Sequence, residues 1–80
     1  MEPVLLLRDG NEIPLTALDI TWSRADGWRF TATANEPVAA KVVALGLCGT
    51  VHSVIIENHH RARDKTSLAG KLAASDPPRA

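Results

Sequence analysis

The sequence has little cysteine and few aromatic residues: one Cys, no Tyr, one Phe and two Trp among 80 residues. A single Cys excludes an internal disulfide framework and fits a reducing compartment, while an intermolecular disulfide stays open. Neither sign of charge dominates, since nine Lys and Arg balance nine Asp and Glu. A net charge of zero argues against a general polyanion-binding protein. The composition therefore excludes a disulfide scaffold and disfavours a broadly nucleic-acid-binding chain.

Long hydrophobic runs and a basic N-terminal segment are also missing. No apolar run approaches the ~18 residues of a membrane span, and Met1-Glu2-Pro3 has an acidic residue where a secretion signal needs positive charge. We therefore expect a soluble, unprocessed chain in the cytoplasm. A chain of 80 residues forms one domain at most and buries a modest fraction of its surface. Such a marginal core favours partners or oligomerisation.

The clearest pattern lies in residues 18–34, which contain all three aromatic residues. Apolar residues occupy every second position on both sides of Asp26-Gly27, and this alternation predicts a β-hairpin. A two-residue turn would mix the apolar and polar faces. A three-residue loop over residues 25–27 keeps the faces separate, pairs Trp22 with Phe30, and puts the glycine in the left-handed position that such loops need.

The same register predicts two uses for the aromatic side chains. Arg24 would lie opposite Trp28, near enough for a cation–π contact. The alternation favours placing all three aromatic residues in the core, whereas the position of Trp28 beside the loop makes it a candidate anchor for a protein partner.

A first hairpin precedes this one. Residues 4–8 form a short apolar run that ends at Asp9-Gly10-Asn11, a strong turn signal. A two-residue turn pairs Leu6 with Ile13, and a three-residue turn pairs Leu7 with Ile13; both registers keep apolar residues together. The first arm is apolar on both faces, so a helix or a neighbouring subunit must cover one of them.

Residues 35–45 have the signals of a helix. Asn35 is a suitable N-cap, and Gly46 can supply a left-handed C-terminal cap. The alternative is a strand over residues 42–45, because paired β-branched residues favour sheets. We prefer the helix because it has caps at both ends. Residues 50–57 then predict a further, largely buried strand.

The character of the sequence changes near residue 59. Residues 1–60 carry 4 basic and 7 acidic residues, whereas residues 61–80 carry 5 and 2. We therefore predict a compact β-rich domain over residues 1–58 and a basic, partly extended tail over residues 59–80 that orders on contact with a partner. The predicted fold is α+β: a small antiparallel meander of two hairpins with one helix, a further strand and the tail. The candidate interaction residues are Trp28, Arg61, Arg63, Lys65, Leu68 and Leu72.

Candidate chemistry is sparse. Cys48, His52, His59 and His60 are the metal-ligand types that could be combined, but seven residues separate His52 from His59, and an odd spacing puts them on opposite sides of a strand. We therefore expect no metal and no cofactor. Residues 45–50 are glycine-containing but lack the Lys of a phosphate-binding loop, and no nucleophile–base arrangement can be specified. We do not expect an enzyme.

Two non-enzymatic functions remain. In the first, the protein is a structural subunit that contacts other subunits, or copies of itself, through sheet faces and tail. In the second, it is a small phage or bacterial regulator that binds a host protein or nucleic acid through basic residues 59–65. No aromatic residue is interleaved with that segment, so a solvated connector is favoured over nucleic-acid contact.

Part of the chain resembles the small β-rich tail and baseplate proteins of tailed bacteriophages. The resemblance rests on Val4-Leu5-Leu6-Leu7-Arg8-Asp9-Gly10, followed by a hairpin with Trp22, Gly27, Trp28 and Phe30, then one helix and a strand. It covers residues 4–57 at the level of pattern. It implies a virion structural protein, assembled in the host cytoplasm in repeated copies, without catalytic activity.

Overall fold

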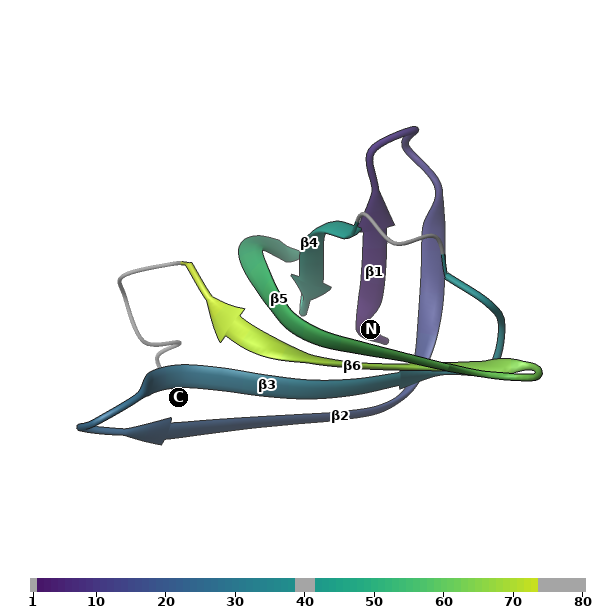
Figure 1. The fold of residues 1–80 in the computed structure, drawn as a ribbon. Coiled ribbons are helices and arrows are strands. Elements are labelled where there is room, and N and C mark those ends of the chain that lie inside the picture. Colours follow the sequence, from purple (N-terminus) through teal and green to yellow (C-terminus); the bar gives the residue numbers. More distant parts are fainter. Residues whose placement is uncertain (1, 39–41, 74–80) are drawn as a thin grey trace.

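The computed structural model describes residues 2–38 and 42–73, and within these residues all regular secondary structure is β (Figure 1). Each pair of neighbouring strands is antiparallel, in the order β1-β2-β3-β6-β5-β4, and β4 returns to pair with β1. The predicted α+β class is therefore wrong, because the strands close into a six-stranded barrel. The strands are β1 (Val4–Leu7), β2 (Glu12–Ser23), β3 (Gly27–Ala34), β4 (Val42–Leu47), β5 (Thr50–Ala62) and β6 (Lys65–Leu72).

The predicted helix over residues 35–45 is wrong. Residues 42–47 form β4, which hydrogen-bonds to β1 on one side and to β5 on the other. Pairing on both sides satisfies the backbone and overrides the helix signals, and the β-branched Val42 and Val43 fit the strand. Gly46, the predicted helix cap, lies inside the strand opposite Val4 and Val51. Residues 39–41 of the predicted helix lie outside the described residues.

The predicted extended tail is also wrong for most of its length. Residues 59–62 continue β5, and residues 65–72 form β6, which lies between β3 and β5. Leu68 and Leu72, predicted to lie in the tail, are thus on a central strand. The last segment, residues 74–80, lies outside the described residues.

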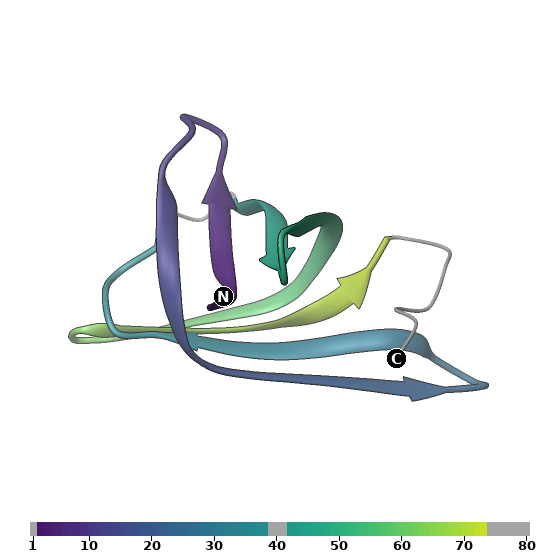
Figure 2. The same ribbon diagram turned by 180° about the vertical axis from the view of Figure 1, so that it is seen from behind.

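Two long strands bend the sheet into a barrel (Figures 1 and 2). The first part of β2 pairs with β1 and the rest pairs with β3, with a register shift between Leu15 and Ala17. Likewise, β5 begins against β4 and continues against β6, with a bulge between Ile56 and Asn58. Because bulges bend and twist a strand, each long strand can serve two sheets and turn the corner between them.

The two hairpins form near the predicted turns, but in other registers. In the β2–β3 hairpin Trp22 lies opposite Trp28, and not opposite Phe30 as predicted, so Arg24 lies in the loop. The face assignment is confirmed, since the two registers differ by two residues and the alternation cannot distinguish them. The hydroxyl of Ser23 accepts a hydrogen bond from the amide of Asp26 at 3.0 Å, which stabilises the observed loop.

The β1–β2 hairpin takes neither of the two predicted registers. Leu5 pairs with Ile13, and the amide of Leu7 donates to the carbonyl of Asn11 at 2.9 Å. The turn includes Gly10, whose φ of 94° lies in the left-handed region that favours glycine. The side chain of Asp9 accepts a hydrogen bond from the amide of Asn11 at 2.9 Å. This Asx turn closes the loop and sets the register.

The interior of the barrel is filled with side chains that alternate along the strands. Val38 follows β3, is fully buried, and is held on both sides of its peptide backbone. Its amide donates to the Thr66 hydroxyl at 2.9 Å, and its carbonyl accepts from Nη2 of Arg61 at 3.2 Å. The buried apolar cluster comprises Leu5, Ile13, Leu15, Phe30, Ala32, Ala34, Val38, Leu45, Leu68 and Leu72.

Gly70 is required where β5 bulges against β6. A Cβ atom placed on it would lie 1.9 Å from the carbonyl oxygen of Ile55 and 3.1 Å from the nitrogen of Glu57. Both are backbone atoms, so no side-chain movement can relieve the overlap. The bulge and the glycine are therefore one structural feature, which carries β5 from one sheet to the next.

Candidate interaction surface

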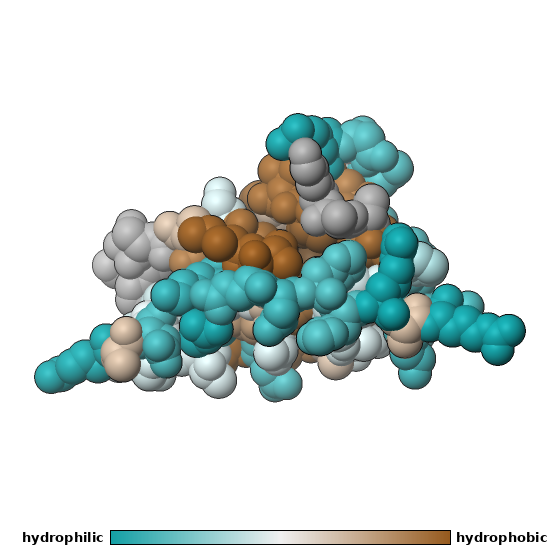
Figure 3. Space-filling view, in the orientation of Figure 1, coloured by the Kyte–Doolittle hydropathy of each residue, from teal (hydrophilic) through white to brown (hydrophobic). Residues whose placement is uncertain are grey.

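An apolar surface covers the outer side of β1, β4 and β5. Val4 of β1, Gly46 of β4 and Val51 of β5 are cross-strand neighbours and share this side. Val51 is 64% exposed, Val43 46% and Ile55 56%. Figure 3 shows hydrophobic residues over the part of the barrel built from these strands, and hydrophilic residues along β3 and β6. We call residues Val4, Leu6, Val43, Gly46, Val51 and Ile55 the apolar face.

A groove of about 380 Å³ lies within this face, lined by Glu2, Val4, Leu6, Glu12, Gly46, Gly49, Thr50 and Val51. At Gly46, the Val4 and Leu6 side chains pack directly against the backbone of β4. The Val4 side chain borders the glycine closely, since a Cβ on Gly46 would lie 3.0 Å from Cγ2 of Val4. The groove therefore has an apolar floor with two carboxylates, Glu2 and Glu12, on its rim.

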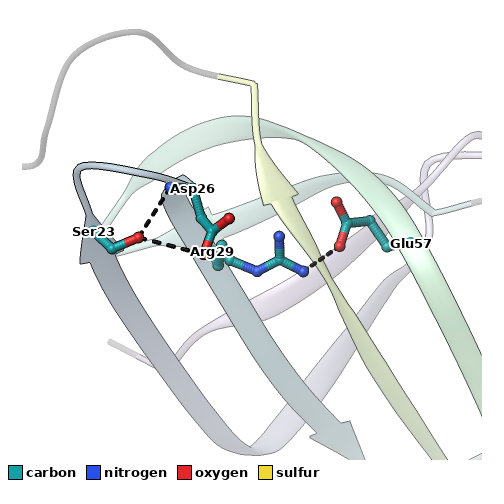
Figure 4. Close-up of polar contacts among 4 residues, drawn as sticks. All are labelled: Ser23, Asp26, Arg29 and Glu57. Atoms are coloured by element: carbon teal, nitrogen blue, oxygen red, sulfur yellow. Dashed lines mark hydrogen bonds and ion pairs between the residues drawn. The ribbon is translucent and has the colours of Figure 1, made fainter.

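The opposite edge of the apolar face carries positive charge. Lys71 of β6 lies directly opposite Ile55 of β5, and Arg29 of β3 is the next residue across. Figure 4 shows the guanidinium of Arg29 reaching past β6 to an ion pair with Glu57. About a third of each of these two side chains is exposed, so the pair adds at most about 1 kcal/mol of stability. It neutralises Arg29, whereas Lys71 has no ion pair with any of residues 2–38 and 42–73.

The structure separates the aromatic residues that the sequence groups together. Phe30 is buried, Trp28 is half-buried and packs against the core, and Trp22 is 58% exposed near the end of the β2–β3 hairpin. The proposed aromatic anchor, Trp28, is thus less accessible than Trp22, which is its partner across the strands. The alternation could not show this difference, because both Trp residues share one face near the hairpin end.

The candidate residues from the predicted tail fall into two groups. Leu68 and Leu72 point into the barrel and expose 4% and 9% of their surface, so they pack within the chain itself. Arg61, at the far end of β5, donates to the Val38 carbonyl. Arg63 and Lys65 are exposed at the β5–β6 turn.

The histidines are arranged differently from the sequence expectation. His52 pairs with Leu45 and His59 with Leu68, both interior residues, so the two histidines share the inner side of β5. The bulge near Glu57 adds the residue that reverses the alternation. Seven strand residues still separate them by about 23 Å, too far to share a metal ion. Among residues 2–38 and 42–73, no three His, Cys, Asp or Glu side chains form a metal-binding group.

One hydroxyl–imidazole contact lies at the groove. Oγ1 of Thr50 lies 3.2 Å from Nε2 of His52, but the same hydroxyl donates its proton to the Leu47 carbonyl at 2.7 Å. The imidazole therefore acts as donor to this oxygen, and no proton is left for it to abstract. The contact stabilises the start of β5 and supplies no activated nucleophile.

Comparisons of the chain with protein-family models, curated proteins and solved structures found no match. Within the part of the chain that the structure describes, no helix has the length and hydrophobicity to cross a bilayer. The apolar face is our candidate interaction surface. Sequence reasoning showed that one of the two apolar faces of β1 needs cover without deciding which. It missed Val51 and Ile55, since it placed the apolar run of β5 in the interior.

Proposed function

We propose that the protein is a non-enzymatic structural subunit of a larger protein assembly, of the kind found in the tail or baseplate of tailed bacteriophages. The observation that carries this proposal is the apolar face on a barrel whose interior is already filled. Among the described residues, three of the four large hydrophobic residues that are exposed lie on β4 and β5. Exposed apolar residues grouped on one side of a small domain mark an interaction site, and a protein partner is the occupant that fits a subunit of an assembly.

The groove supports contact with a protein surface better than small-molecule chemistry. Its floor is apolar and its rim carries two carboxylates, and the Thr50–His52 contact at the groove supplies no activated nucleophile. Two exposed carboxylates remain hydrated, so the groove offers no desolvated group of the kind that catalysis requires. A protein side chain inserted into the groove would instead bury the exposed Val51 beside it.

The second candidate function, nucleic-acid or host-protein binding through residues 59–65, has weaker support. One of its three cations, Arg61, is held by the Val38 carbonyl, and Asp64 lies between the other two at the turn. This leaves a net charge of +1 for Arg63, Asp64 and Lys65 together. A salt-dependent shift of DNA or RNA that is lost on R63A/K65A substitution would favour this function.

The test of the structural role is the composition of assembled particles. Particles purified from cells that carry the gene would be digested and the chain quantified by mass spectrometry against known particle proteins. We expect the chain at a fixed integer ratio to those proteins, through successive density gradients. Its absence from particles, with abundant chain left in the soluble fraction, would overturn the proposal.

A further inference from the structure

We infer that the apolar face pairs with the same face of a second copy of this chain, related by a two-fold axis. This inference rests on the proposed structural role and deepens it, because it names a second copy of the chain as the first partner of the subunit. The apolar face has the two properties that a two-fold interface needs: a shape that fits itself and charges that oppose when one copy is rotated onto the other.

The shape complementarity comes from Gly46 and Val51. They are direct cross-strand partners and both line the groove, so the groove lies immediately beside a valine that is 64% exposed. A two-fold axis through the face places the valine of each copy in the groove of the other. Val4 and Leu6 then line the groove that receives it. Each copy supplies one protruding side chain and one groove, and both are filled together.

The charge complementarity comes from the two edges of the face. Glu2 and Glu12 border it on the β1–β2 side, and Lys71 borders it on the β6 side, opposite Ile55. Rotation by 180° places the acidic edge of one copy against Lys71 of the other, twice in each dimer. An arrangement that places each edge against the same edge of the other copy would instead bring like charges together. The charges therefore select the arrangement in which the acidic edge faces Lys71.

The opposite side of the barrel lacks these properties. The outer positions of β3 and β6 carry Thr31, Thr33, Ser67 and Ala69, together with the Arg29–Glu57 pair. This polar surface needs no cover. It also provides a matched control position, Thr31, which is exposed on a strand as Val51 is.

The experiment measures the mass of the full chain by sedimentation equilibrium over a concentration series. We expect a monomer–dimer equilibrium, a dissociation constant raised at least tenfold by V51D and by I55D, and no change for T31D. Circular dichroism of each variant checks that the barrel is retained, and NMR chemical shifts on dilution of the unmodified chain locate the interface without any substitution. Shifts confined to residues outside the apolar face would overturn the inference.

A charge exchange tests the two-fold geometry. K71E and E12K each place like charges together in a homodimer, and we expect each to raise the dissociation constant at least tenfold. An equimolar mixture restores opposite charges at both contacts of a heterodimer, so we expect it to recover the dimer. A mixture that stays monomeric would refute the arrangement. A chain that stays monomeric at all concentrations but occurs in particles would refute self-pairing and leave the structural role intact.

Discussion

The hydrogen bond between Thr66 and Val38 gives the sharpest test of how the barrel is held closed. Both residues are completely buried, and the hydroxyl of Thr66 accepts the Val38 amide at 2.9 Å. Thr66→Val keeps the shape of the side chain and removes the acceptor. The buried amide then loses its partner, which costs about 1–3 kcal/mol. Since Val38 follows β3, this contact fixes that segment of the chain to the start of β6.

The expected loss of about 2 kcal/mol is large for a chain of this size. It lowers the melting temperature by roughly 8–16 °C, at about 4–8 °C per kcal/mol for small domains, and the urea midpoint by about 1–2 M. Equilibrium unfolding in urea, followed by tryptophan fluorescence at one fixed protein concentration, measures it. The fixed concentration matters because dimerisation would add to the apparent stability.

Two further variants isolate the hydrogen bond. Thr66→Ser keeps the acceptor and removes one methyl group, with an expected loss of about 1 kcal/mol. Thr31→Val makes the same chemical change as Thr66→Val at an exposed position of β3 and should alter stability by less than about 0.5 kcal/mol. The reasoning is refuted if Thr66→Val is no more destabilising than Thr66→Ser, or if it matches the exposed control.

Three further substitutions probe the backbone and the interior. Gly70→Ala forces a Cβ to within 1.9 Å of the Ile55 carbonyl oxygen and should lower the free energy of unfolding by about 3 kcal/mol or more. Gly46→Ala should cost less, because the nearest atom to its Cβ belongs to a side chain, that of Val4. Equal urea midpoints for the two variants would contradict this. Cys48 and Gly49 join β4 to β5, and both have positive φ, 49° and 81°. Because Asn adopts this backbone conformation more readily than Cys, Cys48→Asn should raise the stability by about 0.5–1 kcal/mol; a lower melting temperature would contradict this. Nε2 of His59 is buried and has no hydrogen-bond partner within the described part of the chain. His59→Leu should therefore raise the free energy of unfolding in urea by about 1 kcal/mol, and a loss of stability would show that the imidazole is hydrogen-bonded in solution.

The sequence predicted the local features that depend on neighbouring residues. Alternation fixed which side chains of residues 18–34 share a face, and Asp9-Gly10 and Asp26-Gly27 marked two turns correctly. The glycines in both turns have positive φ, a requirement that only the local backbone imposes. The two-residue register error in the β2–β3 hairpin has the same origin, because alternation with a period of two accepts any even shift.

The candidate surface was only partly predictable. The apolar run in β1 showed that one face needs cover, and the structure confirms that Val4 and Leu6 lie on the outside. The exposure of Val51 and Ile55 could not be read from the sequence, since a run of β-branched residues suits an outer strand face and an inner one equally. Which side of β5 faces the core depends on its partners and on its bulge.

The sequence by itself determined the β-hairpins, their turns and the alternating apolar faces, because these follow from steric limits and contacts over a few residues. Only the tertiary structure decided that residues 42–47 and 65–72 form strands. Val42-Val43 with Gly46 fits a helix or a strand, and Leu68 with Leu72 lies on one side of either. Pairing with strands distant in sequence resolved both ambiguities. Between β3 and β5, the backbone of β6 is hydrogen-bonded on both sides while Leu68 and Leu72 are buried.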